Sequence, residues 1–128
     1  MKFVLDTFAW LEYFNGSESG KKVSKIIESE ENDIFSSIIT IAEVSSILKR
    51  KEGNIELGHQ TIINLSKIYF INLEFAKEAG ILHAETRKKI KDFGFADAIV
   101  LLTARKLGAK ILTGDPHFKG FKEAVLIK

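Results

Sequence analysis

The chain has 128 residues, of which 45% are hydrophobic, and it contains one proline and no low-complexity run; this composition indicates one globular domain with a single core. The absence of cysteine excludes disulfides and cysteine-based zinc or iron–sulfur sites, and it fits a reducing compartment. The net charge of +2 excludes few partners. Asp6 and Glu12 interrupt the N-terminal apolar stretch, and no run approaches the roughly 20 apolar residues that span a bilayer. We therefore expect a cytoplasmic protein without a secretion signal or membrane segment.

Short apolar runs alternate with segments of helical period along the chain. In chain order, the pattern predicts a strand at 3–5, helices at 7–14 and 19–31, a strand at 33–37, helices at 40–51 and 57–68, a strand at 68–73, helices at 74–93 and 95–108, and strands at 110–115 and 124–127. Gly108 is a plausible glycine directly after the last helix. This alternation predicts an α/β domain over residues 1–128, with a mostly parallel sheet of four to five strands and helices on both faces.

Four acidic residues follow predicted strands or open predicted helices. Asp6 follows the first strand, and Asp115 follows the fourth. Glu43 lies near the start of the helix after the second strand, and Asp97 lies in the first turn of a mostly apolar helix. Ligands of such sheets bind beyond the carboxyl ends of the strands. If the first and fourth strands are neighbours, these carboxylates share one rim of the sheet.

Each acid also has a purely structural interpretation. Thr40 and Glu43 match a capping box, Asp97 fits the positive end of a helix dipole, and Asp115 before Pro116 fits a helix N-cap. For any one residue, this interpretation is the more common outcome.

The combination of the four acids favours a metal site. Two carboxylates about 5 Å apart repel by roughly 3 kcal/mol at an effective dielectric constant near 20, whereas a helix cap contributes only about 1 kcal/mol. A shared cluster must therefore protonate or hold cations. Oxygen ligands without cysteine suit Mg²⁺ or Mn²⁺, the ions of metal-assisted phosphodiester hydrolysis.

The ordered set resembles a PIN domain, specifically the short VapC-type toxin ribonucleases. The matching stretches are Asp6-Thr7 after the first strand, TIAEV around Glu43, FADAIVL around Asp97, and Thr113-x-Asp115. The resemblance implies strand order 3-2-1-4-5, a homodimer, an antitoxin partner protein and an endoribonuclease that uses Mg²⁺ or Mn²⁺. Asp6, Glu43, Asp97 and Asp115 would hold the metal, and a metal-activated water would leave 5′-phosphate and 3′-hydroxyl ends.

Three further positions bear on this predicted site. Thr7 and Thr113 are candidates to orient the carboxylates by hydrogen bonds. Many relatives carry another acid where this chain has His117, so a second metal would be weaker or absent. We expect His117 to be a solvated loop residue rather than a substrate contact.

Charged and aromatic clusters suggest where partners bind. Setting the four acids aside leaves 13 of the 17 acidic residues against 19 basic ones, a surplus available to phosphates. The RNA-binding candidates are Arg87, Lys88, Lys89 and Lys91, although cations also complement helix C-termini. The aromatic-rich first predicted helix offers Trp10 or Tyr13 as an antitoxin contact.

Three alternatives remain open at this stage. One is a phosphoacceptor signalling domain, which also has an acidic Mg²⁺ pocket, but this chain carries Glu43 and Asp97 on helices instead of strand ends. Another is a PIN-type RNA-processing nuclease outside a toxin–antitoxin pair. The third is a binding module whose acids are only helix caps.

Overall fold

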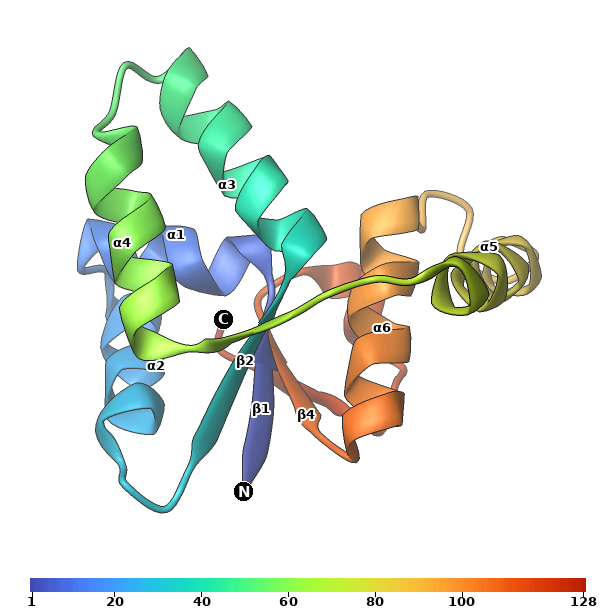
Figure 1. The fold of residues 1–128 in the computed structure, drawn as a ribbon. Coiled ribbons are helices and arrows are strands. Elements are labelled where there is room, and N and C mark those ends of the chain that lie inside the picture. Colours follow the sequence, from blue (N-terminus) through green and yellow to red (C-terminus); the bar gives the residue numbers. More distant parts are fainter.

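The computed structural model describes residues 1–128 and contains a five-stranded sheet in the order β3-β2-β1-β4-β5 (Figure 1). All neighbouring strands are parallel. The strands are β1 (Lys2–Leu5), β2 (Asp33–Ser37), β3 (Lys67–Tyr69), β4 (Lys110–Thr113) and β5 (Ala124–Leu126). The predicted α/β class and the predicted strand order are both confirmed.

Helices connect successive strands and cover the sheet on both sides. They are α1 (Thr7–Asn15), α2 (Glu18–Glu28), α3 (Ile38–Arg50), α4 (Ile55–Leu65), α5 (Leu73–Arg87) and α6 (Phe95–Leu107), with a short 3₁₀ helix, η1 (Pro116–Phe118), before β5. In Figure 1, α1 to α4 lie on one side of the sheet, and α5 and α6 lie on the other. No helix combines the length and apolar character needed to cross a membrane.

The central strand β1 divides two apolar cores. Successive side chains of a strand point to opposite faces, so Phe3 and Leu5 enter one core while Val4 enters the other. The first core includes Trp10, Val23, Val44 and Ile62 of helices α1 to α4; the second is built mainly from α6, including Ala98, Leu101 and Ala104. Because both faces of β1 are covered, its sequence is a continuous apolar run.

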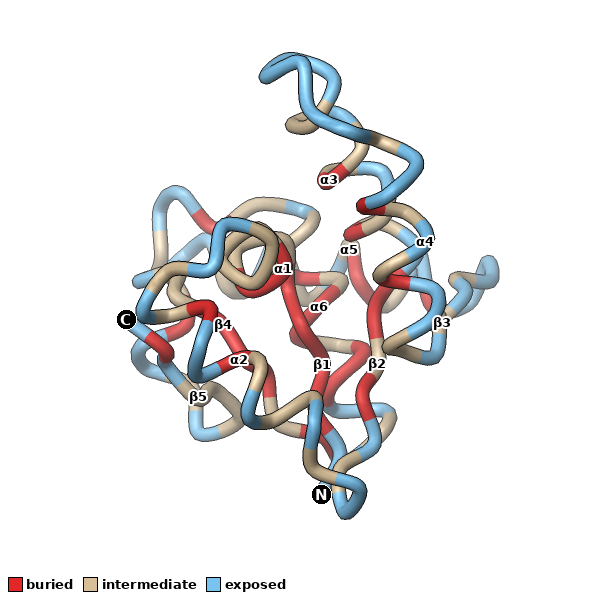
Figure 2. Tube along the Cα trace, turned by 90° about the vertical axis from the view of Figure 1, so that its left-hand side faces the viewer, coloured by how far each residue is buried: buried red, intermediate tan, exposed pale blue.

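The carboxyl ends of the strands define one edge of the sheet, the upper edge in Figure 1. Helix α1 leaves β1 through Asp6, and α3 follows β2 without any intervening residue. The burial map shows that the sheet centre is enclosed, whereas the far end of α3 and its connection to α4 are exposed (Figure 2). Polar side chains that follow the central strands therefore gather at a solvent-facing rim above a closed core.

The predicted ends of one strand and three helices lie several residues too far along the chain; the helices predicted at 19–31 and 57–68 end at Glu28 and Leu65. The predicted strand at 68–73 ends at Tyr69, because the side chain of Asn72 accepts a hydrogen bond from the Phe75 amide and caps α5. Helix α5 ends at Arg87 rather than at residue 93. The glycine prediction is confirmed, since Gly108 has φ of 64° directly after α6.

Candidate metal centre

Asp6 is a buried carboxylate at the junction of β1 and α1. Its side chain is the N-cap of α1, where Oδ1 accepts a hydrogen bond from the Ala9 amide at 2.9 Å. Oδ2 accepts a hydrogen bond from the hydroxyl of Thr113. Burial raises the pKa of Asp6 to about 7; the two hydrogen bonds lower it, and the charges of Asp115 and Asp97 raise it. Ionisation of Asp6 is therefore less favourable in the folded protein than in the unfolded chain.

Thr113 links the ends of β1 and β4, which are neighbours in the sheet. Besides donating to Asp6, its Oγ1 accepts a hydrogen bond from the Asp115 amide at 2.9 Å. Thr113 is fully buried, so water cannot replace either bond. One hydroxyl thus fixes the position of one acid and the backbone of another. The predicted orienting contact of Thr113 is present in the structure.

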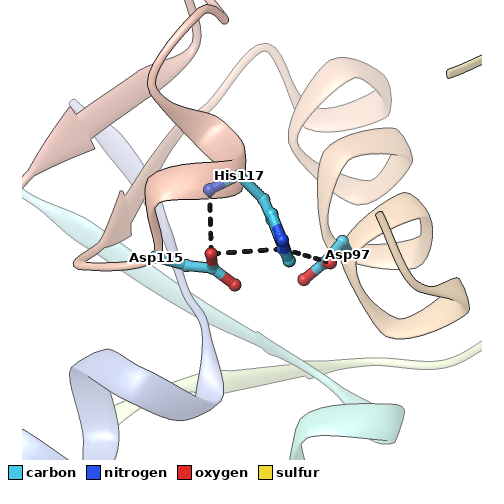
Figure 3. Close-up of side chains that lie close together, drawn as sticks. All are labelled: Asp97, Asp115 and His117. Atoms are coloured by element: carbon cyan, nitrogen blue, oxygen red, sulfur yellow. Dashed lines mark hydrogen bonds and ion pairs between the residues drawn. The ribbon is translucent and has the colours of Figure 1, made fainter. Parts of the chain in front are cut away.

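A second group consists of Asp97, Asp115 and His117, which face one another across the space between α6 and η1 (Figure 3). One potential ligand atom from each lies within 4.8 Å of the other two. His117 Nδ1 is 3.3 Å from Asp97 Oδ2 and 3.3 Å from Asp115 Oδ1. The group therefore brings an imidazole nitrogen and two carboxylates to one point.

Both aspartates of this group also cap backbone amides. Asp97 Oδ2 accepts from the Gly94 amide at 2.9 Å, and Asp115 Oδ1 accepts from the His117 amide at 2.9 Å. No protein donor contacts the other oxygen of either carboxylate. Capping fixes the orientation of each side chain and leaves one oxygen available for a ligand. The capping and metal-binding interpretations are thus compatible with each other.

Electrostatics also mark Asp97 as part of a crowded acidic site. Burial raises the pKa of Asp97, the Gly94 hydrogen bond and His117 lower it, and the charge of Asp115 raises it. Asp97 and Asp6 therefore both resist ionisation, and Asp115 contributes to this in both cases. A bound divalent cation would reverse the balance by favouring the ionised carboxylates.

Glu43 lies in the second turn of α3 and approaches the site through Thr7. The Thr7 hydroxyl donates to Glu43 Oε1 at 2.7 Å, so the predicted orienting role of Thr7 matches a contact in the structure. The capping-box interpretation of Thr40 and Glu43 is wrong, because α3 begins at Ile38 and its N-cap is Ser37. Glu43 is not part of the group of Asp97, Asp115 and His117.

Two expectations about neighbouring residues are corrected. Trp10 is fully buried and donates through Nε1 to Ser36 Oγ at 2.9 Å, so it offers no surface to an antitoxin. His117 is only partly solvated: its side chain is one-third exposed, but its Nδ1 is shielded between two carboxylates. Tyr13 remains half-buried.

The basic residues proposed for RNA lie where α5 ends. Arg87, Lys88, Lys89 and Lys91 are all exposed, and Arg87 Nε donates to the carbonyl of Lys91 at 3.0 Å. This segment leads through Phe93 and Gly94 into the start of α6, where Asp97 lies. The positive segment and one acid of the site are thus close in sequence on the same side of the sheet.

The residues present fit a divalent cation. Two buried or partly buried carboxylates have raised pKa values, two carboxylate oxygens lack protein donors, and the buried His117 Nδ1 has no hydrogen-bond partner. The site is open to solvent, since the side chains of Asp97, Asp115 and His117 are 20%, 28% and 33% exposed. An open site leaves room for a large substrate.

The fold and the site together define the class of protein. It is an α/β domain whose all-parallel sheet has, at its carboxyl edge, carboxylates that form a candidate centre for a hard cation. The sequence profile of the PIN domain family matches residues 3–124. The chain belongs to the PIN domain family.

Solved structures share the fold over nearly the whole chain. A toxin–antitoxin complex from Klebsiella pneumoniae is similar with a TM-score of 0.75 and 23% identity, covering 98% of this chain and 97% of that one. VapC20 from Mycobacterium tuberculosis, a toxin that cleaves the sarcin–ricin loop, has a TM-score of 0.71 and 18% identity, covering 94% and 97%. VapBC2 from Rickettsia felis, bound to a promoter DNA fragment, has a TM-score of 0.73 and 18% identity, covering 98% and 97%. No curated protein matches the chain by sequence.

Proposed function

We propose that this protein is a metal-dependent endoribonuclease of the VapC toxin type. The observation that carries the proposal is the group of Asp97 and Asp115 in a PIN domain, with Asp6 linked to Asp115 through the Thr113 hydroxyl. The fold neighbours described as toxins or toxin–antitoxin complexes support the same class.

Asp6, Asp97 and Asp115, with Glu43, would hold Mg²⁺ or Mn²⁺. When bound, such an ion supplies an activated water as nucleophile and positive charge for the phosphoryl oxygens. Thr113 fixes Asp6 and the Asp115 backbone, so these carboxylates need little rearrangement when they bind a ligand. Thr7 donates a hydrogen bond to Glu43 and orients its carboxylate. Because water replaces the ribose 2′-hydroxyl as nucleophile, the products carry 5′-phosphate and 3′-hydroxyl ends.

The exposed basic segment Arg87, Lys88, Lys89 and Lys91 would bind the RNA backbone. A double change of Lys88 and Lys89 to Gln removes two phosphate contacts, which should lower the slope of log affinity against log salt by about 1.4 for a single strand. Binding titrations between low and high salt measure this slope. The matched control changes Lys21 and Lys25 of α2, which are also exposed, and should leave the slope unchanged.

The proposed partners are an antitoxin and a second copy of the chain. A hollow of about 440 Å³ lies between α1, α3 and α4, with Tyr13, Phe14, Leu48 and Leu57 among its lining residues, and it supports antitoxin docking beside Tyr13. Phe70 and Leu73 are 73% and 91% exposed, which supports a dimer that covers the start of α5. Co-purification with the product of an adjacent small gene, together with the mass in solution, tests both partners.

Cleavage of structured RNA tests the proposed activity. Purified protein should cleave RNA when Mg²⁺ or Mn²⁺ is present, and cleavage should stop when EDTA removes the metal. Asp97→Asn should lower the rate more than about 100-fold, since even groups that only support metal ligands contribute 10–100-fold. The matched control, Asp33→Asn, removes a carboxylate from the opposite end of β2 and should keep full activity.

Three results would contradict the proposal. If the acids are only helix caps, no cleavage occurs, or cleavage survives both EDTA and Asp97→Asn. A 2′,3′-cyclic phosphate product would show that the ribose hydroxyl is the nucleophile and would exclude hydrolysis by activated water.

A further inference from the structure

His117 is held rigidly at the edge of the acidic site. Its amide donates to Asp115 Oδ1, and Pro116 before it opens the 3₁₀ turn. Phe118, directly after it, is fully buried and packs its ring against Phe93 at a centroid distance of 5.9 Å. The hydrogen bond of the His117 amide and the buried ring of Phe118 thus fix the backbone that carries the imidazole. The imidazole points toward Asp97 (Figure 3).

The inner nitrogen of this imidazole lies between two carboxylates but makes no hydrogen bond of good geometry within the protein. Nδ1 is shielded from solvent and has no hydrogen-bond partner, although it is 3.3 Å from an oxygen of Asp97 and of Asp115. Buried polar atoms are almost always hydrogen-bonded, and an exception calls for an explanation such as an absent ion. Two donors bound side by side to one ion at about 2.1 Å lie about 3.0 Å apart. The spacing of Nδ1 and the two oxygens is close to that arrangement.

We propose that His117 Nδ1 is a ligand of the divalent cation, and that it makes this site prefer Mn²⁺ to Mg²⁺. The inference rests on the metal site of the proposed function and adds a nitrogen ligand to it. A neutral imidazole with its proton on Nε2 presents the Nδ1 lone pair to the ion.

The preference follows from ligand chemistry. Mg²⁺ is a hard ion that binds oxygen and keeps several waters, so an imidazole contributes little to its binding. Mn²⁺ takes the same carboxylate ligands, but it stands at the start of the first-row transition series, whose ions bind nitrogen donors with increasing affinity up to Cu²⁺, whereas Mg²⁺ lies outside that series. Because a neutral His117 brings no negative charge, it adds nothing to the charge offered to Mg²⁺ and adds a donor that favours Mn²⁺. Divalent transition-metal ions that follow Mn²⁺ in the first row should bind more tightly still.

Calorimetric titration of the metal-free protein with Mn²⁺ and Mg²⁺ tests the preference. His117→Ala should lower the Mn²⁺ affinity at least tenfold and change the Mg²⁺ affinity less. His117→Asp restores an oxygen ligand, so it should strengthen Mg²⁺ binding relative to His117→Ala and reduce the Mn²⁺ preference. His59→Ala changes a histidine on α4, outside the acidic group, and should match the unaltered protein.

A spectroscopic measurement tests the ligand directly. The electron spin-echo envelope of bound Mn²⁺ should show ¹⁴N modulation in the unaltered protein and in His59→Ala, and it should lose that modulation in His117→Ala. Both ions binding with no ¹⁴N modulation would overturn the inference and leave the nuclease proposal standing. Binding of neither ion would overturn the metal site itself, and the inference with it.

Discussion

Apart from Asp97 and His117, the candidate site has two halves that differ in how firmly they are held. The strand-end half consists of Asp6, Thr113 and Asp115, and the helical half consists of Thr7 and Glu43. In the strand-end half, a fully buried hydroxyl and backbone amides fix both carboxylates. In the helical half, Glu43 is half-buried and has one hydrogen bond, from Thr7. The strand-end half is therefore pre-formed, whereas the helical half can adjust when metal or RNA binds.

The largest expected effect comes from removing the charge of Asp6. The folded protein holds the Asp6 proton up to about pH 7, whereas the unfolded chain releases it near pH 3.8. The folded state therefore binds more protons between these values, and the stability contributed by Asp6 falls as pH rises through this window. Asp6→Asn should stabilise the metal-free protein above pH 7 by on the order of 4 kcal/mol, and by almost nothing below pH 4.

Urea unfolding in EDTA across this pH range measures the effect of Asp6→Asn. Asp33→Asn is the matched control, because its carboxylate is exposed at the opposite edge of the sheet, and it should show no comparable gain. A loss of stability above pH 7 in Asp6→Asn would mean that Asp6 is a favourable cap and not a strained charge.

An intermediate effect is expected from Thr113→Val. The change removes the hydroxyl that donates to Asp6 and accepts from the Asp115 amide, while it keeps the side-chain shape. Metal affinity should fall 10–100-fold, the usual loss when a group that orients ligands is removed. Isothermal titration with Mn²⁺ measures this loss. Thr103→Val, a buried threonine on α6 that bonds only to the Ile99 carbonyl, should leave metal affinity unchanged.

The smallest effect is expected from Thr7→Val in the helical half. Glu43 is half-buried and can bond to water in place of Thr7, so metal affinity should fall less than about tenfold. The same titration compares this variant with Thr113→Val. A larger loss from Thr7→Val than from Thr113→Val would reverse the assignment of the two halves.

The difference between the halves also explains what the sequence could predict. Apolar runs such as Phe3–Leu5 and the alternation with helices predicted the parallel sheet, because burial on both faces imposes that pattern. Asp6 and Asp115 follow neighbouring strands, so topology alone brought them to one rim. The hydrogen bonds of Thr113 are a consequence of the same arrangement.

Predictions failed where contacts between distant segments decide the outcome. The position of His117 depends on how η1 packs against α6, and the burial of Trp10 depends on its bond to Ser36 of β2; neither leaves a local pattern. The capping-box interpretation of Thr40 and Glu43 fails because Ser37, which ends β2, also caps α3, so the S/T-x-x-E match lies inside the helix.

The central claim is that Asp6, Asp97 and Asp115 share a divalent cation. Crystals grown with Mn²⁺ and measured near the manganese absorption edge test it most directly. We expect one anomalous peak about 2.2 Å from oxygens of Asp97 and Asp115, beside Asp6, and no such peak in Asp97→Asn. If crystals saturated with Mn²⁺ show no anomalous peak at this rim, or show a peak only elsewhere on the surface, the claim is contradicted.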